Sequence, residues 1–97
     1  MNLVFIRSTA KKILAATPVR KAFLFGSAAR GEGGPNSDLD ILVVLDSERK
    51  VGLIEFIKIQ MKLEEAFHTR VDLISSDGLS PHIRPFIEKD KMLIYEA

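Results

Sequence analysis

Apolar residues recur at helical spacing in two parts of the chain. Between residues 3 and 16 they stand three or four positions apart, which predicts a helix that ends before Pro18. From residue 48 to 67 the same spacing predicts a longer helix, with Ser47 as its N-cap. Its apolar positions are too many for one core-facing stripe. This helix is therefore either packed deeply in the core or also in contact with a partner.

Short apolar runs predict a sheet between and after these helices. The runs at residues 22–25 and 71–74 are typical of buried strands. Residues 38–45 alternate at first and then become aliphatic, which predicts a strand buried on both faces towards its end. Ser80-Pro81 indicates the start of a further helix, and residues 92–95 predict a last short strand. The order of elements indicates an α/β (α+β) fold, a small mixed β-sheet with helices packed against it.

The composition fits one soluble domain spanning residues 1–97. Hydrophobic residues make up 46% and charged residues 28%, which argues against disorder. The net charge of +1 and the lack of an aromatic-basic surface argue against direct nucleic-acid binding. Cysteine is absent, which excludes a disulfide scaffold and thiol catalysis. No apolar run approaches the ~20 residues that span a bilayer, and the start does not resemble a secretory signal. We expect a cytoplasmic protein without membrane contact.

Asp38 and Asp40 stand two positions apart at the start of the predicted strand of residues 38–45. Because successive side chains of a strand point to opposite faces, both carboxylates lie on one face of the sheet. They repel each other unless a cation lies between them, and carboxylate oxygens are ligands that Mg²⁺ prefers. The pair therefore indicates a magnesium site, and a solvated strand face is the alternative.

Gly26 and Ser27 end the preceding strand and begin a turn. Glycine lets the backbone approach a ligand closely, and a hydroxyl with backbone N–H groups at a helix start suits a phosphate. An ordinary turn with a serine cap explains the same residues. Arg30 is the base of an otherwise acidic segment, where it either meets a phosphate or pairs with Glu32 or Asp38.

Asp72 stands between Val71 and Leu73 on a predicted core strand. An acid in that position is costly unless it reaches the surface or an ion. It faces water if its strand is an edge strand, and it completes a group of three carboxylates if its strand adjoins that of Asp38 and Asp40. Three carboxylates, two Mg²⁺ ions and a phosphate-binding turn are the parts of a two-metal site for phosphoryl or nucleotidyl transfer.

Gly26-Ser27, ten intervening residues and Asp38-Leu39-Asp40 together resemble the signature of the nucleotidyltransferase superfamily that includes DNA polymerase beta. The minimal nucleotidyltransferases, also called the MNT or MntA-like group, are the most similar. The matching core runs from about Phe23 to Ser75 and includes Asp72 in a Val-Asp-Leu-Ile strand. The resemblance implies a polymerase beta-like nucleotidyltransferase fold.

The resemblance also implies a role for each candidate residue. The first two aspartates would bind both Mg²⁺ ions, and the third would bind the catalytic ion and help to deprotonate an acceptor hydroxyl. The Gly-Ser turn would hold the triphosphate of ATP. The catalytic and metal-binding residues would be Asp38, Asp40 and Asp72. The nucleotide-binding residues would be Gly26, Ser27, Arg30 and Ser37.

A partner protein is implied as well. Minimal nucleotidyltransferases are commonly antitoxins encoded beside an HEPN-type ribonuclease toxin, and they resemble an enzyme that transfers AMP from ATP to a tyrosine of that toxin. No arginine of this chain has a histidine five residues on, so the toxin's Arg-x4-His pattern is absent. The chain would be the transferase half of such a pair. Neutralisation by binding and occlusion is the alternative, and a homo-oligomer stays open.

Overall fold

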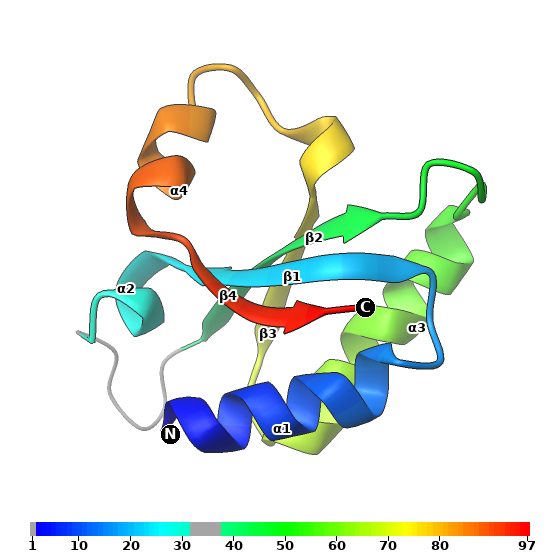
Figure 1. Ribbon diagram of the computed structural model, residues 1–97, viewed down its shortest axis with the longest axis horizontal. Helices are drawn as coiled ribbons and strands as arrows, with labels where there is room; N and C mark the ends of the chain where they lie inside the picture. Colours follow the sequence, from blue (N-terminus) through cyan, green and yellow to red (C-terminus); the bar gives the residue numbers. More distant parts are fainter. Residues whose placement is uncertain (1, 32–37) are drawn as a thin grey trace.

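A four-stranded sheet forms the centre of the computed structural model, which describes residues 2–31 and 38–97 (Figure 1). The strands lie in the order β3-β2-β1-β4. β1 is antiparallel to both β2 and β4, whereas β2 and β3 are parallel, so the sheet is mixed. The strands are β1 (Val19–Phe25), β2 (Leu39–Leu45), β3 (Val71–Ser75) and β4 (Met92–Glu96).

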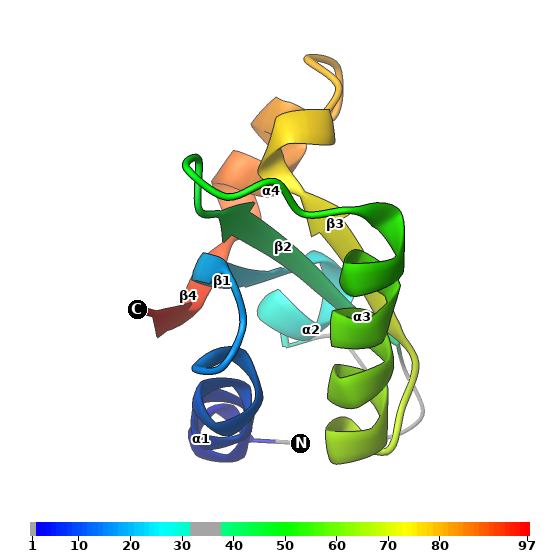
Figure 2. The same ribbon diagram turned by 90° about the vertical axis from the view of Figure 1, so that its right-hand side faces the viewer.

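Helices cover both faces of this sheet, as expected for the α/β class. The helical elements are α1 (Leu3–Leu14), α2 (Gly26–Ala29), α3 (Leu53–Phe67), the 3₁₀ turn η1 (Ser76–Gly78) and α4 (Arg84–Asp90). Figure 2 shows α1 and α3 beneath one face, and α4 on the opposite side. The short helix α2 lies at the end of the sheet where β1 ends and β2 begins. None of the helices in the described part of the chain is long and apolar enough to span a membrane.

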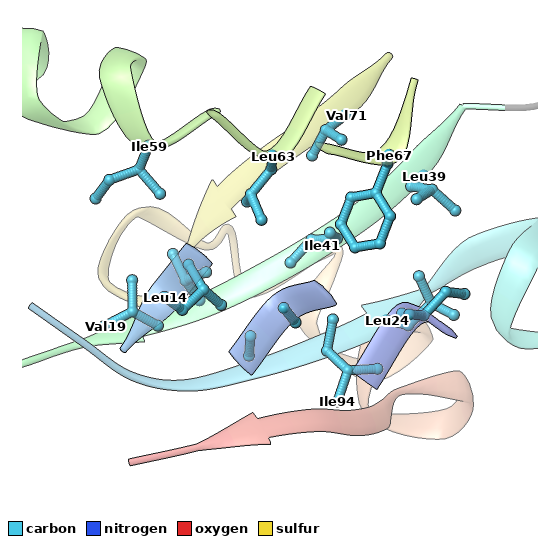
Figure 3. Packing of buried hydrophobic residues seen from close by; sticks show 14 residues of the cluster. Leu14, Val19, Leu24, Leu39, Ile41, Ile59, Leu63, Phe67, Val71 and Ile94 are labelled. Atoms are coloured by element: carbon cyan, nitrogen blue, oxygen red, sulfur yellow. The ribbon is translucent and has the colours of Figure 1, made fainter. Parts of the chain in front are cut away.

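The main core lies between the sheet and the pair α1 and α3. Leu39, Ile41 and Val43 of β2 belong to this core, because alternate residues of a strand share a face. Figure 3 shows the buried side chains of α3 directed towards the strands, with Leu63 and Phe67 among them. The opposite face of β2 therefore carries the residues between these positions, Asp40 among them. Burial at this helix face fixes which side of the sheet the aspartates occupy.

The long helix begins later than its apolar pattern predicts. α3 starts at Leu53 with Gly52 as its N-cap, so the prediction of Ser47 as cap was wrong. Residues after β2 form a turn instead, in which the Asp46 side chain accepts a hydrogen bond from the backbone N–H of Glu48 at 3.0 Å. An aspartate side chain that bonds two residues ahead competes with helix formation at this point.

The helix after β3 also begins later than expected. Ser80 Oγ accepts a hydrogen bond from the backbone N–H of His82 at 3.2 Å, so Ser80 caps a turn and not the helix. α4 starts at Arg84, with Pro85 in its first turn. Proline is tolerated there because the first N–H groups of a helix have no partner within the helix.

Two predictions of burial differ from the structure. The middle of β2, Ile41–Val43, is more buried than its end, because Val44 and Leu45 are only partly covered. The wide apolar pattern of α3 does not produce a helix covered on several sides. Its outer side leaves Leu53 75% and Ile54 71% exposed. The apolar residues of α3 therefore form one stripe that packs in the core and a second stripe that faces away from the sheet.

Candidate active site

Asp40 on β2 and Asp72 on β3 are register partners across the parallel strand pair. Neighbouring strands lie about 4.8 Å apart, and paired residues point to the same face. The two carboxyl groups lie near enough for the negative charge of Asp72 to act on Asp40. Asp40 is half-buried, whereas Asp72 lies exposed on the edge strand. The structure thus brings these two predicted residues together, on the sheet face opposite to α1 and α3.

The surroundings of Asp40 raise its pKa above the ordinary value of 3.8. Burial is the largest cause, because it disfavours the charged form. The negative charge of Asp72, a hydrogen bond that protonated Asp40 donates to Asp72, and the charge of Asp38 act in the same direction. The positive charge of Arg30 acts in the opposite direction and lowers the pKa of Asp40. The site therefore gathers more negative charge than its own residues neutralise.

Gly26 lies directly against Asp40. Its φ of +74° falls in the left-handed region, which favours glycine. A β-carbon at this position would collide with Oδ2 of Asp40 and lie 3.2 Å from its Cγ. Phe25, the preceding residue, pairs with Asp40 in the β1–β2 register. Only glycine lets the junction between β1 and α2 pass this close to the carboxylate.

The other predicted residues lie around this contact. Asp38 directly precedes β2, is half-buried, and lies near enough for its charge to affect Asp40. Ser27 is half-buried in α2, the single helical turn that follows Gly26. Ser37 lies outside the described residues, so its place in a nucleotide site stays a prediction.

Arg30 forms an ion pair that the sequence pattern does not indicate. Its Nη1 lies 3.0 Å from Oδ2 of Asp90, the last residue of α4. Of the partners expected for Arg30, Glu32 lies outside the described residues. Asp90 is sixty positions away in the chain and stands in a run of alternating charges that is typical of a solvated helix end. No local motif singles it out.

The donor set fits the Mg²⁺ ions that the resemblance implies. Asp38, Asp40 and Asp72 are hard oxygen ligands near one another, and their accumulated negative charge is what a divalent cation neutralises. As the side chains stand in residues 2–31 and 38–97, however, no group of three or more His, Cys, Asp or Glu side chains is arranged to hold a metal ion.

Known proteins resemble this chain over most of its length. The profile of the family described as "Nucleotidyltransferase domain" matches residues 6–94. "Putative protein adenylyltransferase MJ1379" of Methanocaldococcus jannaschii is 38% identical over 87 residues, which cover 88% of this chain and 85% of the relative. Protein adenylyltransferase MntA of Thermococcus cleftensis is 36% identical over 76 residues, covering 78% of this chain and 75% of the relative.

Solved structures share the fold. A structure described as a "putative minimal nucleotidyltransferase" superposes with a TM-score of 0.70 at 33% identity and covers 95% of both chains. A toxin–antitoxin structure with AMP-PNP gives a TM-score of 0.75 at 22% identity, covering 100% of this chain and 75% of the other. An MNT antitoxin in complex with the tri-AMPylated HEPN toxin of Shewanella oneidensis gives 0.74 at 18% identity, covering 99% and 74%.

The resemblance read from the Gly-Ser turn and the aspartates is confirmed by these matches, and so are the fold class and the expectation of an enzyme of the nucleotidyltransferase type. The family profile spans nearly the whole chain. The chain therefore belongs to the nucleotidyltransferase family, and within it to the minimal nucleotidyltransferases of the MntA type.

Proposed function

We propose that the protein is a Mg²⁺-dependent adenylyltransferase that transfers AMP from ATP to a hydroxyl group of a partner protein. The observation that carries this proposal is the pairing of Asp40 with Asp72 on one sheet face, with Gly26 against Asp40. This arrangement places the backbone of the Gly26 turn directly beside one of the two carboxylates. The adenylyltransferase names of several relatives support AMP as the transferred group.

The residues divide the work of the reaction between them. Asp38, Asp40 and Asp72 would hold the two Mg²⁺ ions, which would offset the charge of the triphosphate and of the departing pyrophosphate. Gly26 and Ser27 hold the triphosphate, and Arg30 and Ser37 contribute to the same nucleotide site. Asp72 accepts the proton of the acceptor hydroxyl. The new bond joins that oxygen to the α-phosphorus of ATP, and the bond between the α-phosphorus and the bridging oxygen breaks to release pyrophosphate.

The position of Asp72 supports its assignment to the acceptor side. It is exposed on the edge strand β3, whereas Asp40 is half-buried between two strands. A large acceptor such as a folded protein reaches an exposed edge carboxylate more readily than an inner one. The inner aspartate is correspondingly suited to the ions and the nucleotide.

The partner we propose is an HEPN-type toxin, which makes this chain the antitoxin of the pair. Structural neighbours that include an MNT antitoxin bound to an HEPN toxin support the setting. The exposed apolar stripe of α3 also provides surface for a protein contact.

The test is to incubate the protein with ATP labelled at the α-phosphate, Mg²⁺ and the HEPN-type protein encoded beside it. Label on a hydroxyl residue of that protein, lost with EDTA and with Asp38→Asn, is the expected result. An unlabelled partner that is nevertheless inhibited in a tight complex would replace this proposal by neutralisation through occlusion. Absence of both labelling and complex formation would refute the proposed partner.

A further inference from the structure

The ion pair between Arg30 and Asp90 links the end of α2 to the end of α4. Arg30 caps α2, and its backbone N–H donates to the carbonyl oxygen of Gly26 at 3.2 Å. Its guanidinium donates to Asp90 on α4 at 3.0 Å. The backbone of Arg30 is thus bonded to the Gly-Ser turn, while its side chain is bonded to α4, a helix distant in the chain.

Asp90 lies on a helix that is anchored by a buried side chain. Ile87, one turn earlier in α4, is only 3% exposed, which anchors the helix to the rest of the molecule. The side chain of Asp90 is 23% exposed and that of Arg30 is 43% exposed, so the pair is partly shielded from water. Shielding strengthens an ion pair relative to one in open solvent.

The orientation of the Arg30 guanidinium decides whether it can bind a phosphate at the site. Arg30 ends the single helical turn that begins at Gly26, and the backbone of Gly26 lies directly against Asp40. An arginine has several rotatable bonds, so an unsupported guanidinium loses much of its entropy when it binds a phosphate. A carboxylate that holds the guanidinium beforehand reduces that loss.

We propose that Asp90 is a positioning residue that holds Arg30 over the nucleotide site, so that its guanidinium meets the phosphates of ATP. This inference rests on the proposed function and extends it to a residue outside the aspartate and Gly-Ser motifs. It gives α4 a part in ATP binding, although α4 carries none of the predicted site residues.

The experiment measures the affinity of the whole chain for ATP and Mg²⁺ by calorimetry, without any partner protein. Asp90→Asn should weaken binding about fivefold, the upper range for a surface ion pair. The matched control is Glu88→Gln, which removes the 2.8 Å pair between Glu88 of α4 and Lys91, the residue that follows the helix, and changes the net charge equally. It should change the affinity less than about twofold.

Three further measurements separate positioning from a structural role. In an Arg30→Ala background, Asp90→Asn should have no additional effect on ATP affinity, because the group that it positions is gone. Asp90→Glu keeps the charge and should restore most of the affinity. Tripolyphosphate with Mg²⁺, which lacks the nucleoside, should lose affinity in Asp90→Asn by the same factor as ATP. Thermal unfolding identifies the temperature at which all variants are folded.

Several results would contradict the proposed role of Asp90. Wild-type affinity in Asp90→Asn, an equal loss in Glu88→Gln, or an undiminished effect in the Arg30→Ala background would each overturn the positioning role while leaving the proposed enzyme intact. Loss of affinity for ATP but not for tripolyphosphate would overturn the assignment of Arg30 to the phosphates. Absence of ATP binding in the wild-type protein would refute the proposed function and this inference with it.

Discussion

Replacing Gly26 with alanine tests the contact on which the site depends. The φ of +74° costs an L-residue about 1–2 kcal/mol. The new β-carbon would also collide with Oδ2 of Asp40, so that side chain must leave its position, which adds about 0.5–1.5 kcal/mol if it is forced off a rotamer. We expect a loss of about 1.5–3.5 kcal/mol in the free energy of unfolding for Gly26→Ala. A catalytic group displaced by about 1 Å reduces the rate on the order of 100-fold.

Gly31 provides a matched control within the same chain. It has the same φ of +74°, but a β-carbon there would meet nothing within 4 Å. Gly31→Ala should therefore show the backbone cost alone, about 1–2 kcal/mol, and retain most of the transferase activity. Gly78, which has neither a positive φ nor a close neighbour, gives the baseline for a glycine-to-alanine change.

The assays are thermal or urea unfolding and single-turnover transfer from labelled ATP at a temperature where all three variants are folded. A loss of about 1 kcal/mol corresponds to a fall in Tm of about 4–8 °C for a domain of this size. The reasoning is refuted if Gly26→Ala retains as much activity as Gly31→Ala, because the collision with Asp40 would then have no consequence for the site.

Further predictions concern charge, chemistry and packing. The folded-state pKa of Asp40 lies above its unfolded value, so without Mg²⁺ the free energy of unfolding should fall as pH rises through this pKa. In EDTA, Asp40→Asn should flatten this dependence on pH. The same variant should reduce transfer at least about 100-fold. A slope that persists in the variant would assign it to other groups. Asp72→Asn should slow single-turnover transfer more than it weakens ATP binding measured by calorimetry, and equal effects would contradict its acceptor-side role. Leu63→Ala, at a fully buried position of α3, should cost about 2–5 kcal/mol in urea unfolding, whereas Met61→Ala, 61% exposed on the same helix, should cost less than about 0.5 kcal/mol. Comparable losses at both positions would show that α3 is covered on its outer side.

Local patterns predicted the parts of the site that lie close together in the chain. Asp38 and Asp40 are two positions apart at the start of the strand that the sequence predicts, and strand geometry alone indicates a common side. Gly26 and Ser27 stand between a strand and a turn, and the structure places them at the start of α2. Such inferences can be made from the sequence because apolar periodicity and glycine geometry act over a few residues.

Helix starts were predicted less well, because several residues near each start compete to cap it. Ser47 and Ser80 are both reasonable caps by residue type. Asp46 and Ser80 instead bond backbone N–H groups of turns that precede the helices. The choice between a cap and a turn depends on how the following helix must approach the sheet, which no short window of sequence contains.

The sequence by itself determined the acidic motif, the Gly-Ser turn and the order of helices and strands, because these follow from neighbouring residues. Only the tertiary structure decided that β3 lies beside β2 with Asp72 opposite Asp40, and that Asp90 holds Arg30. Strand pairing and long-range ion pairs join residues that are far apart in the chain, and a charged side chain carries no periodic signal that names its partner. The pairing is fixed by burial of the apolar faces of β2 and β3 against α3, which leaves the two aspartates together on the other side.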